Sequence, residues 1–204
     1  KKLIVFFSKF SIFLYLLVAV PLFSFTEFIL QIWLNDVPDY ALLFTRLTLI
    51  VVFFEVLSAP LWLTVQASGN IQRYQIIISF ILILNLPIAY MCFMEWNQPV
   101  FAFVAKIFTA ILAFIFRVYS VGLLGCLNIK EYVTGLLLRL VGLLVVIIPI
   151  IYFNFYHKIS SISEMMLNTF SIIFLLIIVA FFLLLNRNEY KIIFKFISKI
   201  FKKV

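Results

Sequence analysis

The chain has 204 residues, of which 66% are hydrophobic and only 12% are charged, and its formal net charge at neutral pH is +8. Ordinary soluble domains carry about 25% charged residues, so this composition excludes a water-soluble globular protein. The apolar runs are continuous rather than alternating, which excludes a β-barrel and predicts an all-α integral membrane protein. The cationic residues lie mainly between and after these runs, so we interpret the charge as an orientation signal and expect no nucleic-acid partner.

Six apolar runs follow one another, and we expect each to form a transmembrane helix. Their approximate limits are 10–23, 40–70, 74–94, 100–124, 132–153 and 165–185. The polar-bordered segment that follows the first run, around Trp33, either lengthens that helix or lies at the membrane surface. Short loops join all the runs. The sequence therefore predicts a six-helix transmembrane bundle over residues 1–186.

Residues 187–204 form a separate basic segment. Lys191, Lys195 and Lys199 recur every four residues, with Ile and Phe between them. This spacing predicts a basic amphipathic helix that lies on the cytoplasmic membrane surface, where anionic lipids attract it. We interpret this cytoplasmic tail mainly as a topological anchor, with membrane lipids as its partner.

The placement of cations between the runs predicts the orientation of the bundle. If both termini are cytoplasmic, the outer loops carry a single lysine, Lys158. The inner segments then carry Lys1, Lys2, Lys9, Arg73, Lys130, Arg187, Lys191, Lys195, Lys199, Lys202 and Lys203. This asymmetry follows the positive-inside rule, so we expect both ends of the chain in the cytoplasm.

A carboxylate, Glu55, lies near the middle of the second run. At about 100° per residue it shares one helix face with Thr48, Ala59, Trp62 and Gln66. A charge at this depth is costly against lipid, so Glu55 is a candidate for ion or proton coupling in a transport cycle. The alternative is a structural ion pair with a cation on a neighbouring helix.

The fourth run carries a cationic face. Lys106, Ala110, Ala113 and Arg117 fall close to one line along the helix, and Thr109 borders it. The two alanines leave room beside the charges, and an arginine fork with a mobile lysine suits an anionic headgroup in a water-filled cavity. The alternative is that both side chains reach opposite membrane interfaces from a long helix.

Patterns typical of enzymes and metalloproteins do not occur in the sequence. The one histidine, His157, lies in a loop, and Cys92 and Cys126 are predicted on opposite sides of the membrane. There is no Gly-rich phosphate loop, zinc-ligand spacing or nucleophile elbow. We therefore expect no catalytic residue, cofactor or metal.

Three segments that follow one another are PLFSFTEFILQIWLNDVPDYALLFTRL, LSAPLWLTVQASGNIQRYQ and ILILNLPIAY, with Ala67-Ser68-Gly69 placed before Arg73. In this order they resemble the C-terminal part of bacterial polysaccharide (O-antigen type) flippases of the multidrug/oligosaccharidyl-lipid/polysaccharide exporter superfamily. The resemblance implies a two-lobed transporter of roughly twelve to fourteen helices in the bacterial inner membrane, of which this chain supplies the last six. It also implies an N-terminal lobe upstream in the same chain and a lipid-linked oligosaccharide substrate.

From the residues and this resemblance together, we predict a flippase that moves an undecaprenyl-diphosphate-linked glycan from the inner to the outer leaflet by alternating access. Lys106 and Arg117 are expected to bind the diphosphate, Trp62 to pack against sugar, and Glu55 to exchange a proton or an ion. One alternative is a drug or metabolite exporter of the same superfamily, although a cationic cavity matches cationic drugs poorly. Two others are an integral-membrane transferase and a non-catalytic scaffold in polysaccharide assembly.

Overall fold

The computed structural model describes residues 2–34, 36–69, 71–156 and 161–183, and every regular element within these ranges is helical. Six segments are long and apolar enough to cross a membrane: Leu3–Ser24, Ala41–Ala67, Gln72–Trp96, Val100–Leu123, Ile129–Asn154 and Ile162–Leu183. The predicted all-α bundle with six membrane-length spans is confirmed. The basic amphipathic helix predicted for residues 187–204 lies outside the described residues.

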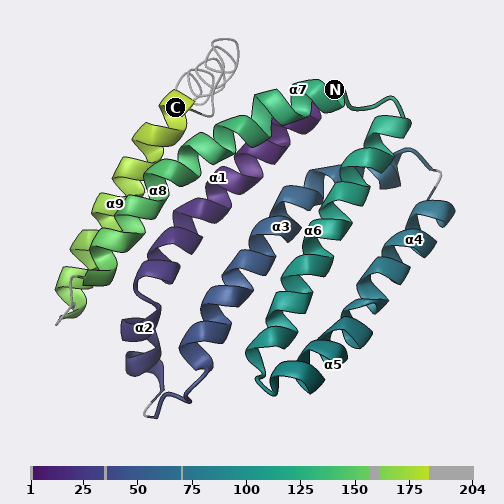
Figure 1. The fold of residues 1–204 in the computed structure, drawn as a ribbon. Helices are drawn as coiled ribbons and strands as arrows, with labels where there is room; N and C mark the ends of the chain where they lie inside the picture. The colour runs from purple at the N-terminus through teal and green to yellow at the C-terminus, as the bar shows by residue number, and fades with distance from the viewer. Residues whose placement is uncertain (1, 35, 70, 157–160, 184–204) are drawn as a thin grey trace.

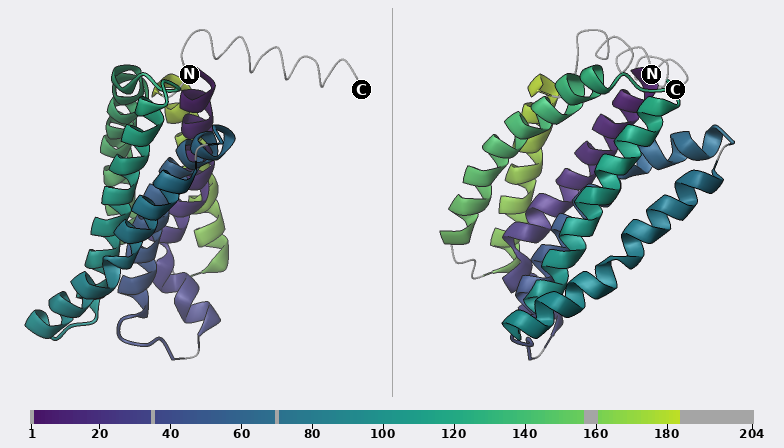
Figure 2. Two further views of the ribbon diagram at one scale, coloured as in Figure 1. Left: turned by 90° about the vertical axis from the view of Figure 1, so that its right-hand side faces the viewer. Right: turned by 45° about the vertical axis from the view of Figure 1, so that its right-hand side comes forward.

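The helices stand side by side in a row, and their order across the row differs from their order along the chain (Figure 1). They are α1 (Lys2–Ser24), α2 (Thr26–Trp33), α3 (Ala41–Ala67), α4 (Gln72–Ile83), α5 (Asn85–Trp96), α6 (Val100–Leu123), α7 (Ile129–Tyr132), the π-helical segment η1 (Val133–Leu137), α8 (Leu138–Tyr156) and α9 (Ile162–Leu183). Helices α9 and α8 lie at one edge of the row, α1, α3 and α6 follow, and α4 with α5 lies at the other edge. In the edge-on view, α4 and α5 cross the row obliquely (Figure 2, left).

The first helix begins earlier than the sequence predicted. Helix α1 starts at Lys2 rather than near Phe10, because Ser8 and Lys9 are buried despite their polar side chains. After α1 the chain breaks at the buried Phe25 and continues as α2, a separate eight-residue helix. Tertiary contacts at these positions therefore outweigh the local polarity on which the predicted boundary depended.

The third span consists of two helices with a break between them. Helix α4 ends at Ile83, Leu84 forms the junction, and α5 begins at Asn85. Pro87 cannot donate a hydrogen bond to the carbonyl of Ile83, so it prevents α4 from continuing without interruption. In the first turn of α5 the same missing donor costs nothing, because those amide groups have no partner within the helix.

The core runs along the facing sides of α1, α3, α6, α8 and α9 and includes residues of α7 and η1. Its buried members include Ile12, Leu16, Val20, Leu57, Leu61, Val65, Ala113, Val121, Tyr132, Leu136, Leu140, Leu143, Ile147, Ile172 and Leu176. Tyr15 of α1 donates a hydrogen bond to the Leu49 carbonyl of α3. Phe44 of α3 stacks on Phe103 of α6, with ring centroids 4.8 Å apart. These contacts hold α3 against α1 on one side and against α6 on the other.

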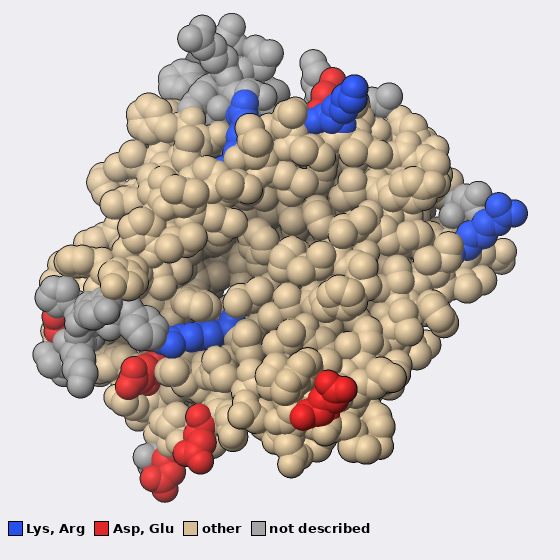
Figure 3. Space-filling model, viewed as in Figure 1, with Lys and Arg blue, Asp and Glu red and all other residues tan. Residues whose placement is uncertain are grey.

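Charged side chains gather towards the two ends of the helices. In Figure 3 most Lys and Arg residues lie along the upper and right-hand rim and most Asp and Glu residues along the lower rim, with an almost uncharged face between them. The N-terminus and the α3–α4 and α6–α7 connections lie towards the upper end, and the α5–α6 connection lies at the lower end. An apolar belt between charged ends is what a bilayer requires of a protein that crosses it.

Candidate functional site

A cavity of about 350 Å³ lies between α3, the α4–α5 break and α6. Its lining residues are Val51, Phe54, Glu55, Ala59 and Trp62 from α3, Leu82 and Asn85 from α4 and α5, and Lys106, Thr109, Ala110, Ala113 and Arg117 from α6. The four residues singled out from the sequence, Glu55, Trp62, Lys106 and Arg117, therefore line one cavity.

One face of helix α3 forms a wall of the cavity, and the helical repeat determines which residues lie on it. Glu55, Ala59 and Trp62 follow at spacings of four and three residues and so point to the same side. Thr48 and Gln66, which the sequence placed on the same stripe, do not line the cavity. Glu55 lies near the middle of this 27-residue helix, and no ion pair involving it is found among the described residues. The carboxylate thus faces a cavity at mid-span.

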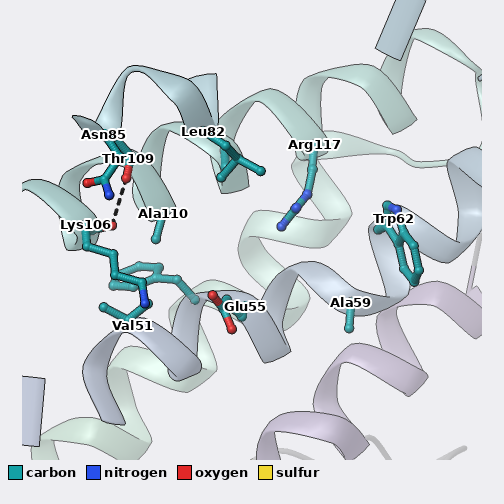
Figure 4. A pocket seen from close by; sticks show the side chains of 12 residues that line it. Val51, Glu55, Ala59, Trp62, Leu82, Asn85, Lys106, Thr109, Ala110 and Arg117 are labelled. Atoms are coloured by element: carbon teal, nitrogen blue, oxygen red, sulfur yellow. Dashed lines mark hydrogen bonds between the residues drawn. The ribbon is translucent and has the colours of Figure 1, made fainter. Parts of the chain in front are cut away.

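Helix α6 supplies the cationic wall. Lys106 and Arg117 are eleven residues apart, which is about 16 Å along the axis, and Ala110 and Ala113 leave space between them. Figure 4 shows the Lys106 side chain reaching towards Glu55, while the Arg117 guanidinium approaches from the other side. Two cations of one helix therefore converge on a region that already contains a carboxylate.

The Arg117 guanidinium is held from behind by a buried tyrosine. Its Nε donates a hydrogen bond to the Tyr74 hydroxyl of α4 at 3.1 Å. Tyr74 is only 5% exposed, and its ring stacks on Phe116 with centroids 5.8 Å apart. This bond uses Nε and leaves the two terminal nitrogens, which form a bidentate fork, for an anion.

Asn85 is a cavity residue that was not assigned to the site from the sequence. Its Oδ1 is buried and has no hydrogen-bond partner among the described residues. A buried acceptor without a partner costs free energy, so a ligand that brings a hydroxyl or amide donor fits this corner of the cavity. The sequence did contain a signal for Asn85, because a polar residue in the middle of an apolar run is a candidate site residue. No comparable signal marked Tyr74, whose partner lies 43 residues away in the chain.

The cavity combines charge with aromatic and apolar walls. Two cations and one carboxylate give its lining a formal net charge of +1, which favours an anion over a cation. Trp62, 39% exposed, offers a broad ring face to a ligand. No three His, Cys, Asp or Glu side chains gather as a metal site in the described ranges. The arrangement suits an amphipathic anion with hydroxyl groups.

The cavity is open at the surface of the bundle. Glu55, Trp62, Leu82 and Lys106 are exposed in this arrangement of helices. Charged side chains at membrane depth are stable only when they face water, protein or a ligand. The open side of the cavity must therefore be covered by something other than lipid tails.

Comparison of the chain with protein-family models, with curated proteins and with solved structures gave no match. The resemblance to polysaccharide flippases thus remains a prediction from the sequence.

Proposed function

We propose that this chain belongs to a flippase that carries an undecaprenyl-diphosphate-linked oligosaccharide from the inner to the outer leaflet of the bacterial inner membrane. The observation that carries the proposal is the cavity in which Lys106 and Arg117 of α6 converge opposite Glu55 and Trp62 of α3. Cations in a mid-membrane cavity contribute little to binding a neutral lipid, but they lower the free-energy cost of moving a diphosphate through the bilayer.

Each part of this substrate class has a chemical counterpart in the cavity. The Arg117 fork and the Lys106 ammonium complement the two phosphates. Trp62 offers an aromatic face to a sugar ring, and the Asn85 amide oxygen accepts a hydrogen bond from a sugar hydroxyl. Leu82 forms an apolar part of the wall and is exposed, so the prenyl chain remains in the surrounding lipid while the headgroup enters.

The proposal includes a second lobe that covers the open side of the cavity. Glu55 and Lys106 are exposed in the six-span bundle, and contact with lipid at mid-membrane costs roughly 2.5–3.5 kcal/mol for each such charge. We assign this cover to an N-terminal lobe of the same chain, as in a transporter of roughly twelve to fourteen helices. Rocking of the two lobes about the cavity then provides alternating access.

An exporter of cationic drugs is the competing function within transport. A cavity lining with a net charge of +1 repels such molecules, and Lys106 and Arg117 offer them no favourable contact. Binding of a diphosphate lipid in preference to a lipophilic cation therefore separates the two functions.

The test measures binding of a farnesyl-diphosphate-linked N-acetylglucosamine to the purified protein in lipid nanodiscs. Arg117→Gln and Lys106→Gln should each weaken binding about tenfold or more, because a hydrogen bond to a charged group contributes about 1.5–3 kcal/mol. Arg73→Gln and Lys130→Gln remove cations outside the cavity and serve as matched controls. Equal affinity for all four variants at equal abundance would contradict the proposed role of the cavity.

A transport measurement extends the test to function. In cells that express the protein with its upstream sequence, Arg117→Gln should reduce the amount of lipid-linked oligosaccharide that becomes accessible outside, at unchanged membrane abundance. Arg73→Gln should leave both quantities unchanged. Normal export by Arg117→Gln would reduce this residue to an interfacial anchor.

A further inference from the structure

We infer that Glu55 is an internal counter-anion of the cavity, and that its carboxyl takes up a proton when a diphosphate dianion binds. This inference rests on the proposed function and deepens it, because it specifies which charge state of the site accepts the substrate. It also determines whether a proton binds together with the substrate or in place of it.

The net charge of the cavity differs between its empty state and the state in which a diphosphate is bound. Among its lining residues the charged groups are Glu55, Lys106 and Arg117. With Glu55 ionised, the empty cavity has a net charge of +1, and a bound diphosphate diester of charge −2 would bring it to −1. With Glu55 protonated, two cations face two negative charges and the loaded cavity is neutral. A net charge at mid-membrane is costly, so the loaded cavity favours the protonated carboxyl.

The Glu55 carboxylate and a bound phosphate would compete for the same two cations, Lys106 and Arg117. Figure 4 shows the Glu55 carboxylate between the Lys106 ammonium and the Arg117 guanidinium. A phosphate that bridges these two groups must approach the carboxylate closely. At separations of about 8 Å and an effective dielectric constant of about 20, each pair of like charges disfavours the ionised form roughly tenfold or more.

Among the described residues that line the cavity, no charged group other than Lys106 and Arg117 accompanies Glu55. Tyr74 of α4 is bonded to Arg117, and α5 contributes only a neutral amide to the lining. Tyr15 of α1 is bonded to a carbonyl of α3. Arg46 lies over the Phe23 ring, 5.5 Å from its centroid, and does not line the cavity. The proton balance of the loaded cavity therefore depends on one carboxyl and two permanent cations.

This arrangement determines the sign of the coupling. The proton enters with the lipid-linked anion, and the empty cavity returns with Glu55 ionised between its two cations. Exchange of an inbound proton for an outbound substrate would require the two to exclude each other, which a carboxyl next to an anion site does not do. The inward proton gradient therefore does not drive export by exchange at Glu55.

The test is calorimetric and uses the same farnesyl-diphosphate-linked N-acetylglucosamine, a diphosphate diester whose own charge is constant between about pH 5.5 and 8.5. Titrations in two buffers of different ionisation enthalpy give the number of protons taken up on binding. The wild-type protein should take up protons on binding within this range, and its affinity should therefore fall as the pH rises.

Glu55→Gln should bind the probe without proton uptake and without this pH dependence, and about tenfold more tightly than wild type at the alkaline end. Glu95→Gln removes a carboxylate outside the cavity and is the matched control. His157→Gln removes the one histidine of the sequence and should leave the proton uptake unchanged.

Proton release, pH-independent binding in the wild-type protein, or weaker binding by a folded Glu55→Gln variant would each overturn the inference while leaving the diphosphate site intact. If Glu55→Gln does not fold, the wild-type titration in two buffers decides alone. Failure of the wild-type protein to bind the probe at any pH would refute the proposed function, and the inference with it.

Discussion

A guanidinium within a membrane-spanning helix must be held in place and yet remain available to its ligand. Arg117 meets both requirements because its Nε is bonded to Tyr74 at 3.1 Å, while its terminal nitrogens remain for an anion. The tyrosine is itself held by burial and by the ring stack on Phe116. We therefore regard Tyr74 as a positioning residue, which affects the proposed anion site only through Arg117.

Tyr74→Phe removes the hydroxyl and keeps the stacked ring. We expect it to weaken binding of the diphosphate probe about threefold to tenfold, because one hydrogen bond contributes about 1 kcal/mol or somewhat more. The thermal midpoint in detergent should change little. In a protein that already carries Arg117→Gln, Tyr74→Phe should cause almost no further loss of affinity for the probe, since the two residues act as a unit. Additive losses in this double-mutant cycle would show that Tyr74 acts independently of Arg117.

At the scale of elements, the connections after α3 and α6 both depend on a glycine, and the first of them leads into α4, which contributes Leu82 to the cavity. Gly69, after α3, has a φ of 77°, and Gly125, after α6, has a φ of 66°. A side chain is strained in this left-handed region, whatever space surrounds it. Gly142 within α8 has nothing within 4 Å of an added Cβ and has no positive φ.

Gly69→Ala and Gly125→Ala should each destabilise the protein by about 1 kcal/mol, which is the cost of a Cβ at positive φ. Gly142→Ala adds the same atom in a helix and should leave stability unchanged or slightly increased. Thermal midpoints from fluorescence-detected gel filtration compare the three variants. A midpoint for Gly142→Ala that falls as far as those of the two turn variants would contradict this account of the connections.

At the scale of the whole molecule, most of the visible Lys and Arg residues lie towards one end of the helices and most of the Asp and Glu residues towards the other (Figure 3). The end that includes the N-terminus and the α3–α4 and α6–α7 connections also has Arg73, at the start of α4, and Lys130, in α7. Cationic loops remain on the cytoplasmic side during insertion. We therefore propose that this end faces the cytoplasm, which places the α2–α3, α5–α6 and α8–α9 connections outside.

Single cysteines test this orientation in a background that carries Cys92→Ser and Cys126→Ser. Substitutions at Asp36, Gln98 and Ser161 should react with a membrane-impermeant thiol reagent added to intact cells. Substitutions at Gln72, the first residue of α4, and at Asn128, just before α7, should react only after the membrane is permeabilised, because both positions lie at the end that faces inward in the proposed orientation. Labelling of Gln72→Cys or Asn128→Cys in intact cells would reverse or refute the proposed topology.

The sequence by itself determined the class of protein, the number of membrane-length spans and the faces that carry charge. These properties are local, because apolar length and helical spacing depend only on neighbouring residues. Glu55 with Trp62, and Lys106 with Arg117, could be grouped in this way before any contact between helices was known. The polar start of the first span was the local signal that misled, since burial of Ser8 and Lys9 extends α1 to Lys2.

Only the tertiary structure decided that these two faces line the same cavity. Helical periodicity states which residues share a side, but the partner of that side depends on packing between helices that are distant in the chain. The same holds for the bond from Arg117 to Tyr74 across 43 residues, and for the position of Asn85 at the break between α4 and α5. Long-range packing of α3, α4 and α6 is thus what brings two separate charged faces together around one cavity.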